Sequence, residues 1–290
     1  MYNQTTLQKI LYFPLTKIVI GILVVGSSVA LLQWLCQFLP GITEDIKNII
    51  TSFAVSTAAL ISYILLFRFY EKRKVIELSV SSFGKNAIIG FSTGFILQSL
   101  IILISYLAGS YSIEKVNSVS FLLTPFAFAL TAGFVAEILI RGIFFRLIEN
   151  TLGTLIALII SAVVFAVLHA GGKDTTFLSV LSVTVQAGVL VSALYIYTRS
   201  LWPSIFFHFA WDFAEPGIYG GINPGMNSDK TLFMSHFSGS EILTGGAKGP
   251  VSSIQAAAFC IIASILFLWL AKQKNNFIRP YWQNKTAADH

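Results

Sequence analysis

Residues 18–39 read IVIGILVVGSSVALLQWLCQFL and contain no charged side chain. A helix needs about 20 apolar residues to cross a hydrocarbon core about 30 Å thick, so this stretch predicts a membrane-spanning helix. The stretch is longer than the roughly 7 to 15 apolar residues of a signal peptide, and no convincing small-residue cleavage site follows it. We therefore expect this span to remain in the mature protein.

Seven further apolar stretches follow along the chain. Apolar residues make up 55% of the 290 positions and charged residues 11%, whereas a soluble domain carries about 25% charged residues. Lipid must therefore cover much of the surface, which excludes a soluble fold and a nucleic-acid-binding role for the basic charge. We expect an all-α fold, a polytopic membrane bundle of about eight transmembrane helices. The seven stretches cover residues 49–67, 87–108, 120–147, 152–168, 177–197, 201–213 and 254–271.

Basic side chains are distributed unevenly between the two sides of this bundle. If the amino terminus lies in the cytoplasm, thirteen lysines and arginines fall on the inner side and five on the outer side. Cytoplasmic loops usually carry the excess of Lys and Arg, so we expect both termini to be cytoplasmic. The chain then divides into amino-terminal transmembrane helices over 1–119, a core over 120–272 and a cytoplasmic tail over 273–290. The outer connection 215–253 is rich in Gly, Pro, Asn and Ser, which predicts irregular backbone, as a plain connector or as a lid.

Charged residues and histidines are rare in the predicted spans, and all of them fall between residues 137 and 212. Glu137 and Arg141 stand four residues apart, where they can pair on one helical face. His208 and Asp212 repeat that spacing in a later span, and His169 ends the span between them. A charged side chain at mid-bilayer costs about 2.5 to 3.5 kcal/mol, so such residues are candidates for function. The alternative is structural, with an ion pair that locks two helices together and histidines that only pack.

These residue types together favour hydrolysis. Neutral imidazoles such as His169 and His208 bind divalent metals, for example zinc, or act as general bases. A carboxylate one turn away, Asp212, can orient the second ring nitrogen. Arg141 can keep Glu137 ionised or steady developing charge. The set is sufficient to hold and activate a water molecule.

Three motifs in order resemble the CPBP family of CAAX proteases and bacteriocin-processing enzymes, also called the Abi family. That family shows Glu-Glu-x-x-x-Arg, then Phe-x-x-x-His, then His-x-x-x-Asn or Asp, each on its own helix. The resemblance is strong over about residues 120–215, and it implies an intramembrane endopeptidase of the CAAX prenyl protease type. It also implies peptide or membrane-protein substrates beside membrane lipid, and a bacterial cytoplasmic membrane. The corresponding segments here are Ala136 to Arg141, Phe165 to His169, and His208 to Asp212.

The chain departs from the family pattern at one position, because Ala136 stands where the first motif glutamate is expected. A methyl group cannot accept a proton. Glu137 would then have to act as the base from a direction about 100° away around the helix, or the protein is a pseudoprotease with a binding, immunity or regulatory role. A proton-coupled transporter would also use such intramembrane residues, although here all of them cluster between residues 137 and 212 and no repeat is visible.

Overall fold

The computed structural model describes residues 5–171, 175–221 and 230–285, except for the side chains of residues 168, 169, 284 and 285. Helices dominate it, which confirms the predicted all-α membrane bundle. Within the described part, six helical segments are long and apolar enough to cross a membrane, and a seventh is shorter. The count of eight spans therefore stays a prediction. The longer helices are α2 Pro14–Cys36, α3 Glu44–Phe69, α4 Phe83–Leu107, α5 Leu123–Glu137, α7 Thr154–Ala170, α10 Trp202–Phe213 and α12 Ile254–Gln273.

Two of the spans are built from several pieces of helix. α5 continues through a π-helical segment, η4 (Ile138–Phe145), into α6 (Arg146–Leu152). α8 (Phe177–Val183) continues through the π-helical segment η5 (Thr184–Leu190) into α9 (Val191–Thr198). α10 itself runs into a third π-helical segment, η6 (Ala214–Ile218). Such segments are rare and occur often at functional sites, because they free backbone groups and redirect side chains.

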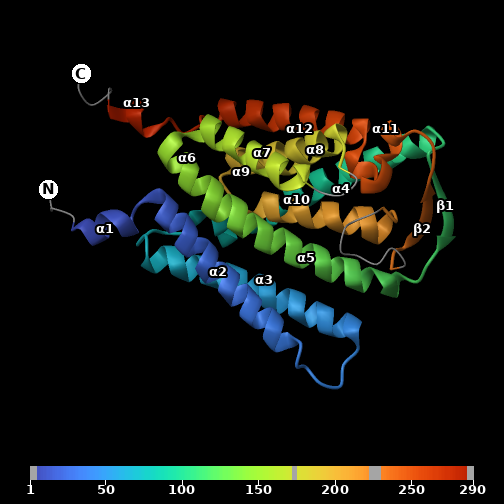
Figure 1. Cartoon of the computed structure of the whole chain (residues 1–290), viewed down its shortest axis with the longest axis horizontal. Helices are drawn as coiled ribbons and strands as arrows, with labels where there is room; N and C mark the ends of the chain where they lie inside the picture. The colour runs from blue at the N-terminus through green and yellow to red at the C-terminus, as the bar shows by residue number, and fades with distance from the viewer. Residues whose placement is uncertain (1–4, 172–174, 222–229, 286–290) are drawn as a thin grey trace.

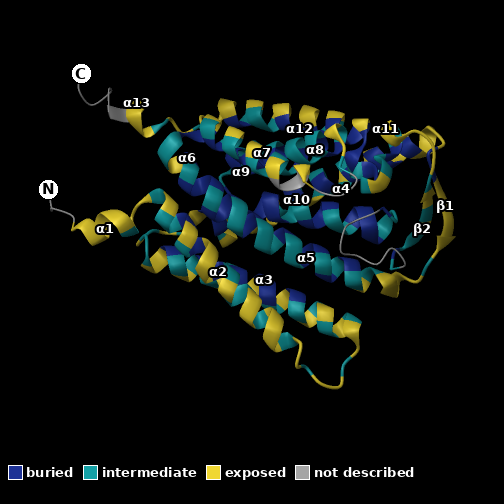
Figure 2. Cartoon of the chain, viewed as in Figure 1, coloured by how far each residue is buried: buried dark blue, intermediate teal, exposed yellow. Residues whose placement is uncertain are grey.

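The outward faces of the bundle are apolar, as contact with lipid requires. Leu23 and Trp34 on α2 and Ile262 and Trp269 on α12 are all exposed. Figure 2 shows exposed residues along the outer sides of these two helices, whereas α10 lies among the others and is largely buried. The hydrophobic surface that a soluble protein would bury is thus available to the bilayer.

Small residues let α10 sit deep in the bundle. A Cβ atom on Gly90 of α4 would lie 2.2 Å from the carbonyl oxygen of Pro203, and one on Gly133 of α5 would lie 2.8 Å from that of Ile205. Only glycine permits such close approach of two backbones, as is common between helices in membranes. α10 is consequently fixed between α4 and α5, with little freedom to slide.

The remaining elements lie at the two ends of the bundle. Figure 1 shows α1 (Thr6–Leu11) and α13 (Tyr281–Lys285) at the same end. Two antiparallel strands, β1 (Tyr111–Val116) and β2 (Phe233–Phe237), lie at the opposite end near the short helix α11 (Glu241–Thr244). The strands were not predicted, since β2 lies in the segment expected to be irregular and its partner is more than a hundred residues away.

Candidate functional site

The first part of the site is a buried ion pair where α5 meets η4. Nη1 of Arg141 lies 3.1 Å from Oε1 and 3.0 Å from Oε2 of Glu137, and both side chains are about 1% exposed. The guanidinium carbon of Arg141 lies 5.1 Å from the ring centroid of Phe165 on α7. A cation–π contact of this kind stabilises a desolvated arginine. The motif helices α5 and α7 therefore meet around Arg141.

The second part of the site is His208, which reaches the same carboxylate from α10. Its Nδ1 lies 2.8 Å from Oε1 of Glu137, and its Nε2 lies 3.4 Å from Oδ2 of Asp212. A ring nitrogen that faces a carboxylate must carry hydrogen to bond it, so this arrangement suits an imidazolium with both nitrogens protonated. His208 is thus oriented by one close carboxylate and one more distant one.

A cavity of about 390 Å³ opens beside His208. Asp212 and Glu215 line it from the same helix and its π-helical extension. Gln186 of η5 and Lys248 from the 246–248 turn add polar groups to a wall that is otherwise largely apolar. Glu137 and Arg141 are not among the lining residues. The ion pair therefore stands behind His208, and His208 separates it from the cavity.

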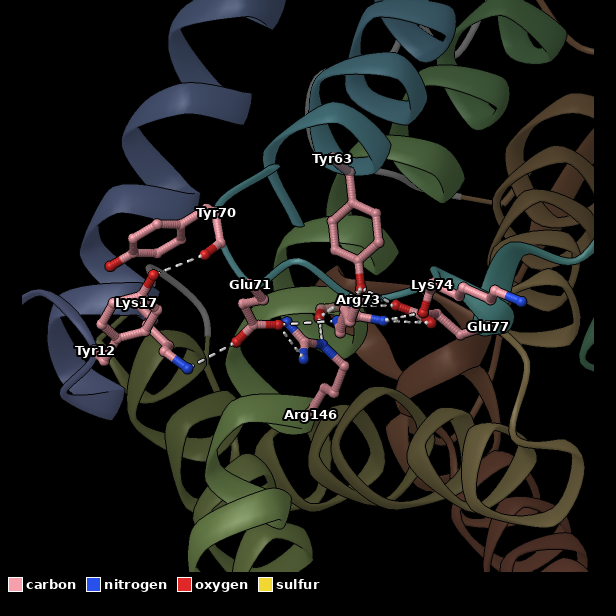
Figure 3. Close-up of polar contacts among 10 residues, drawn as sticks. Tyr12, Lys17, Tyr63, Tyr70, Glu71, Arg73, Lys74, Glu77 and Arg146 are labelled. Atoms are coloured by element: carbon pink, nitrogen blue, oxygen red, sulfur yellow. Dashed lines mark hydrogen bonds and ion pairs between the residues drawn. The ribbon is translucent and has the colours of Figure 1, made fainter. Parts of the chain in front are cut away.

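A second polar cluster fixes the segment that follows the ion pair. The carbonyl oxygen of Gly142, within η4, accepts hydrogen bonds from the hydroxyl of Tyr63 at 2.9 Å and from Nε of Arg146 at 2.8 Å. Nη1 of Arg146 also donates to Glu71 at 2.9 Å, and Nζ of Lys17 on α2 donates to the same carboxylate at 3.0 Å. Figure 3 shows these groups converging from several helices. Side chains thus satisfy a carbonyl inside the π-helical segment, which holds that geometry in place.

The loop after α3 completes this cluster. Arg73 donates to Glu77 at 2.6 Å and to Glu71 at 2.9 Å. Burial alone would raise the pKa of Glu77, but Arg73 and the hydroxyl of Tyr63 hold that pKa below its ordinary value. Burial would likewise raise the pKa of Glu71, but Arg146, Lys17 and Arg73 hold that pKa below its ordinary value. Both carboxylates consequently stay ionised at neutral pH.

The structure brings four of the five predicted site residues together: Glu137, Arg141, His208 and Asp212. His169 belongs to α7, but its side chain lies outside the described residues. Among the described side chains, no group of three His, Cys, Asp or Glu residues is arranged to hold a metal ion. Both ring nitrogens of His208 already face carboxylates. The described side chains therefore do not test the predicted metal at His169 and His208, and that metal stays a prediction.

Sequence reasoning missed Glu215, which it assigned to the outer connection. The available signal was its spacing, since residues 208, 212 and 215 follow an i, i+4, i+7 pattern that places them on one helical face. The apolar run ends at Phe213, so the span was expected to end before Glu215. The helix in fact continues as η6 to Ile218.

Comparison with known proteins supports the resemblance that the motifs suggested. Residues 118–214 match the family model described as type II CAAX prenyl endopeptidase Rce1-like. The matched segment is about a third of the chain and contains the ion pair, His208 and Asp212, but ends one residue before Glu215. No curated protein and no solved structure matched the chain.

Proposed function

We propose that this chain, whose residues 118–214 belong to the CPBP family of CAAX proteases, is an intramembrane endopeptidase that cleaves peptide bonds with an activated water molecule. The observation that carries the proposal is the array behind and around His208. A buried carboxylate and arginine orient a histidine whose other side faces a cavity. Burying an ion pair costs several kcal/mol per ion when its geometry is imperfect. An ion pair at the surface avoids that cost.

In this mechanism His208 acts on the substrate carbonyl. The 3.4 Å separation between Nε2 and Asp212 is long for a hydrogen bond, so the Nε2 hydrogen is available to a substrate oxygen at the cavity wall. Glu137 holds the ring through Nδ1, and Arg141 holds Glu137. Preorganised donors of this kind stabilise the oxyanion that forms when water attacks the carbonyl carbon.

The substrates that we propose are peptide segments of membrane-associated proteins, including carboxyl-terminal segments that carry a prenyl group. The family match supports a prenylated substrate, and the apolar lining beside the polar groups supports a lipid-modified peptide. A volume of about 390 Å³ is within the roughly 300 to 1,000 Å³ typical of ligand pockets, so a short extended segment is a better fit than a folded domain.

We further propose that the protein resides in a bacterial cytoplasmic membrane with both termini in the cytoplasm. The excess of basic residues in the loops predicted to lie on the inner side supports this orientation. The cations Lys17, Arg73 and Arg146 cluster around the carboxylate of Glu71 (Figure 3), and α1 and α13 lie at one end of the bundle (Figure 1). A divalent metal held by His169 and His208 remains a prediction.

Cleavage of a farnesylated Cys-a-a-X peptide by the protein purified in detergent tests this proposal. Wild type should release the carboxyl-terminal fragment, and His208→Ala should lose this activity. His236→Ala is the matched control, because that histidine is exposed on β2 and does not line the cavity. Parallel reactions with a chelator test the metal prediction. Equal activity of His208→Ala and His236→Ala would refute the role given to His208.

The second candidate is a pseudoprotease, and it is favoured by one observation. Ala136 occupies the position of the first motif glutamate, while Glu137 is bonded to Arg141 and His208 and does not line the cavity. A chain of this kind would bind a peptide or lipid tail without cleaving it. An inactive wild type combined with activity in Ala136→Glu would establish this candidate.

A further inference from the structure

A second glutamate stands in the cavity on the same helical face as His208. His208, Asp212 and Glu215 are spaced four and three residues apart along α10 and η6, and all three line the cavity. The cavity thus has a row of three ionisable groups along one wall.

Glu215 differs from the other carboxylates of the site in what surrounds it. Glu137 pairs with Arg141 and His208, and Asp212 faces His208. Glu215 makes no ion pair with a cation of the described residues, and its Oε1 accepts a hydrogen bond from the backbone N–H of Val251 at 3.4 Å. Its oxygen lone pairs are therefore available for a molecule in the cavity.

The position of Glu215 is also closely held. The residue is 3% exposed, and a Cβ atom on Gly221 would lie 2.5 Å from its Cγ. Backbone on both sides, Gly221 and Val251, thus packs against the side chain. Burying a carboxylate without a cation costs free energy, and a purely structural residue here could be an uncharged one of the same shape. A placed, unpaired carboxylate beside a peptide-sized cavity is what a general base requires.

We propose that Glu215 is the general base of the peptidase and fills the role that Ala136 cannot. This inference rests on the proposed function. The Glu215 carboxylate takes a proton from water, and the water oxygen forms a bond to the substrate carbonyl carbon. The carbonyl π electrons move to oxygen, where the N–H of His208 bonds the oxyanion. When the oxyanion collapses, the C–N bond breaks and the proton on Glu215 passes to the leaving amine, so one water is consumed per bond cleaved.

The role requires that Glu137 is not the base. Both of its oxygens lie within 3.1 Å of Arg141, and the more accessible His208 stands between it and the cavity. Glu137 is therefore a positioning residue. Replacing Glu137 would disturb the orientation of His208. Replacing Glu215 would remove the proton acceptor and leave His208 in place.

Kinetics with the farnesylated Cys-a-a-X peptide test the inference. Glu215→Gln keeps the size of the side chain and should lower kcat by about 10²- to 10⁴-fold, the usual contribution of a general base, with KM and the melting temperature unchanged. Glu215→Ala leaves space for a small carboxylate, so added formate should restore part of its activity and an equal concentration of chloride should not. Glu241→Gln is the matched control, because Glu241 is exposed on α11 outside the cavity.

The outcomes separate this inference from the proposed function. Wild-type cleavage together with an undiminished kcat in Glu215→Gln would overturn the role of Glu215 and leave the peptidase proposal standing. Loss of activity in Glu215→Ala that formate does not restore, with a lowered melting temperature, would make the residue structural and also overturn the inference. An inactive wild type with an active Ala136→Glu would overturn the proposed function itself.

Discussion

Replacing Glu137 with glutamine removes one charge from the centre of the site and keeps the shape of the side chain. Arg141 is 1% exposed and its charged partner within the described residues is Glu137, so the variant leaves a buried guanidinium without a counter-charge. Breaking a buried ion pair from one side typically costs about 3 to 5 kcal/mol. At about 2 to 4 °C per kcal/mol for a large domain, the melting temperature should fall by roughly 6 to 20 °C.

The assay is thermal unfolding in detergent, with a second substitution to separate charge from packing. Adding Arg141→Met to Glu137→Gln removes the unpaired cation, and an apolar replacement of a buried pair is often neutral. The double variant should therefore recover most of the lost stability. Glu44→Gln is the control, because the exposed pair of Glu44 with Lys47 is worth no more than about 1 kcal/mol. A double variant less stable than Glu137→Gln would refute this reasoning.

Three further predictions follow from the fold. Gly90→Ala should lower the melting temperature, because its methyl group meets the backbone of α10. Gly84→Ala, at the start of the same helix, meets nothing within 4 Å and should leave the melting temperature unchanged. Equal effects of the two substitutions would contradict the packing of α10 against α4. The pKa of Glu77 is lowered in the folded state, so its stabilisation is present above the ordinary glutamate pKa of about 4.3 and is lost as pH falls through the lower folded value. Glu77→Gln should flatten the decline in melting temperature between pH 5 and about pH 3, and an unchanged slope would contradict it. In a cysteine-free background, Glu241→Cys should react with an impermeant maleimide added to intact cells and Lys72→Cys only after permeabilisation, and the reverse pattern would invert the orientation.

Local patterns in the sequence were enough to predict much of this protein. The eight apolar stretches all coincide with helices, because apolar content and length are properties of consecutive residues. The i, i+4 pairs Glu137 with Arg141 and His208 with Asp212 also lie on shared faces as expected, since helical geometry fixes that spacing. The prediction of irregular backbone over residues 215–253 was only partly correct, because β2 within this connection pairs with a strand that is distant in the chain.

The arrangement of the site itself was decided by the tertiary structure. Glu137 and His208 are 71 residues apart, and they meet because glycines let α10 enter between α4 and α5. Only the cavity shows that Glu137 stands behind His208 while Glu215 faces the open space. Sequence determined which residues carry charge within the membrane, whereas packing determined which charges neutralise one another and which one stays unpaired, because pairing depends on distances across helices that no local pattern contains.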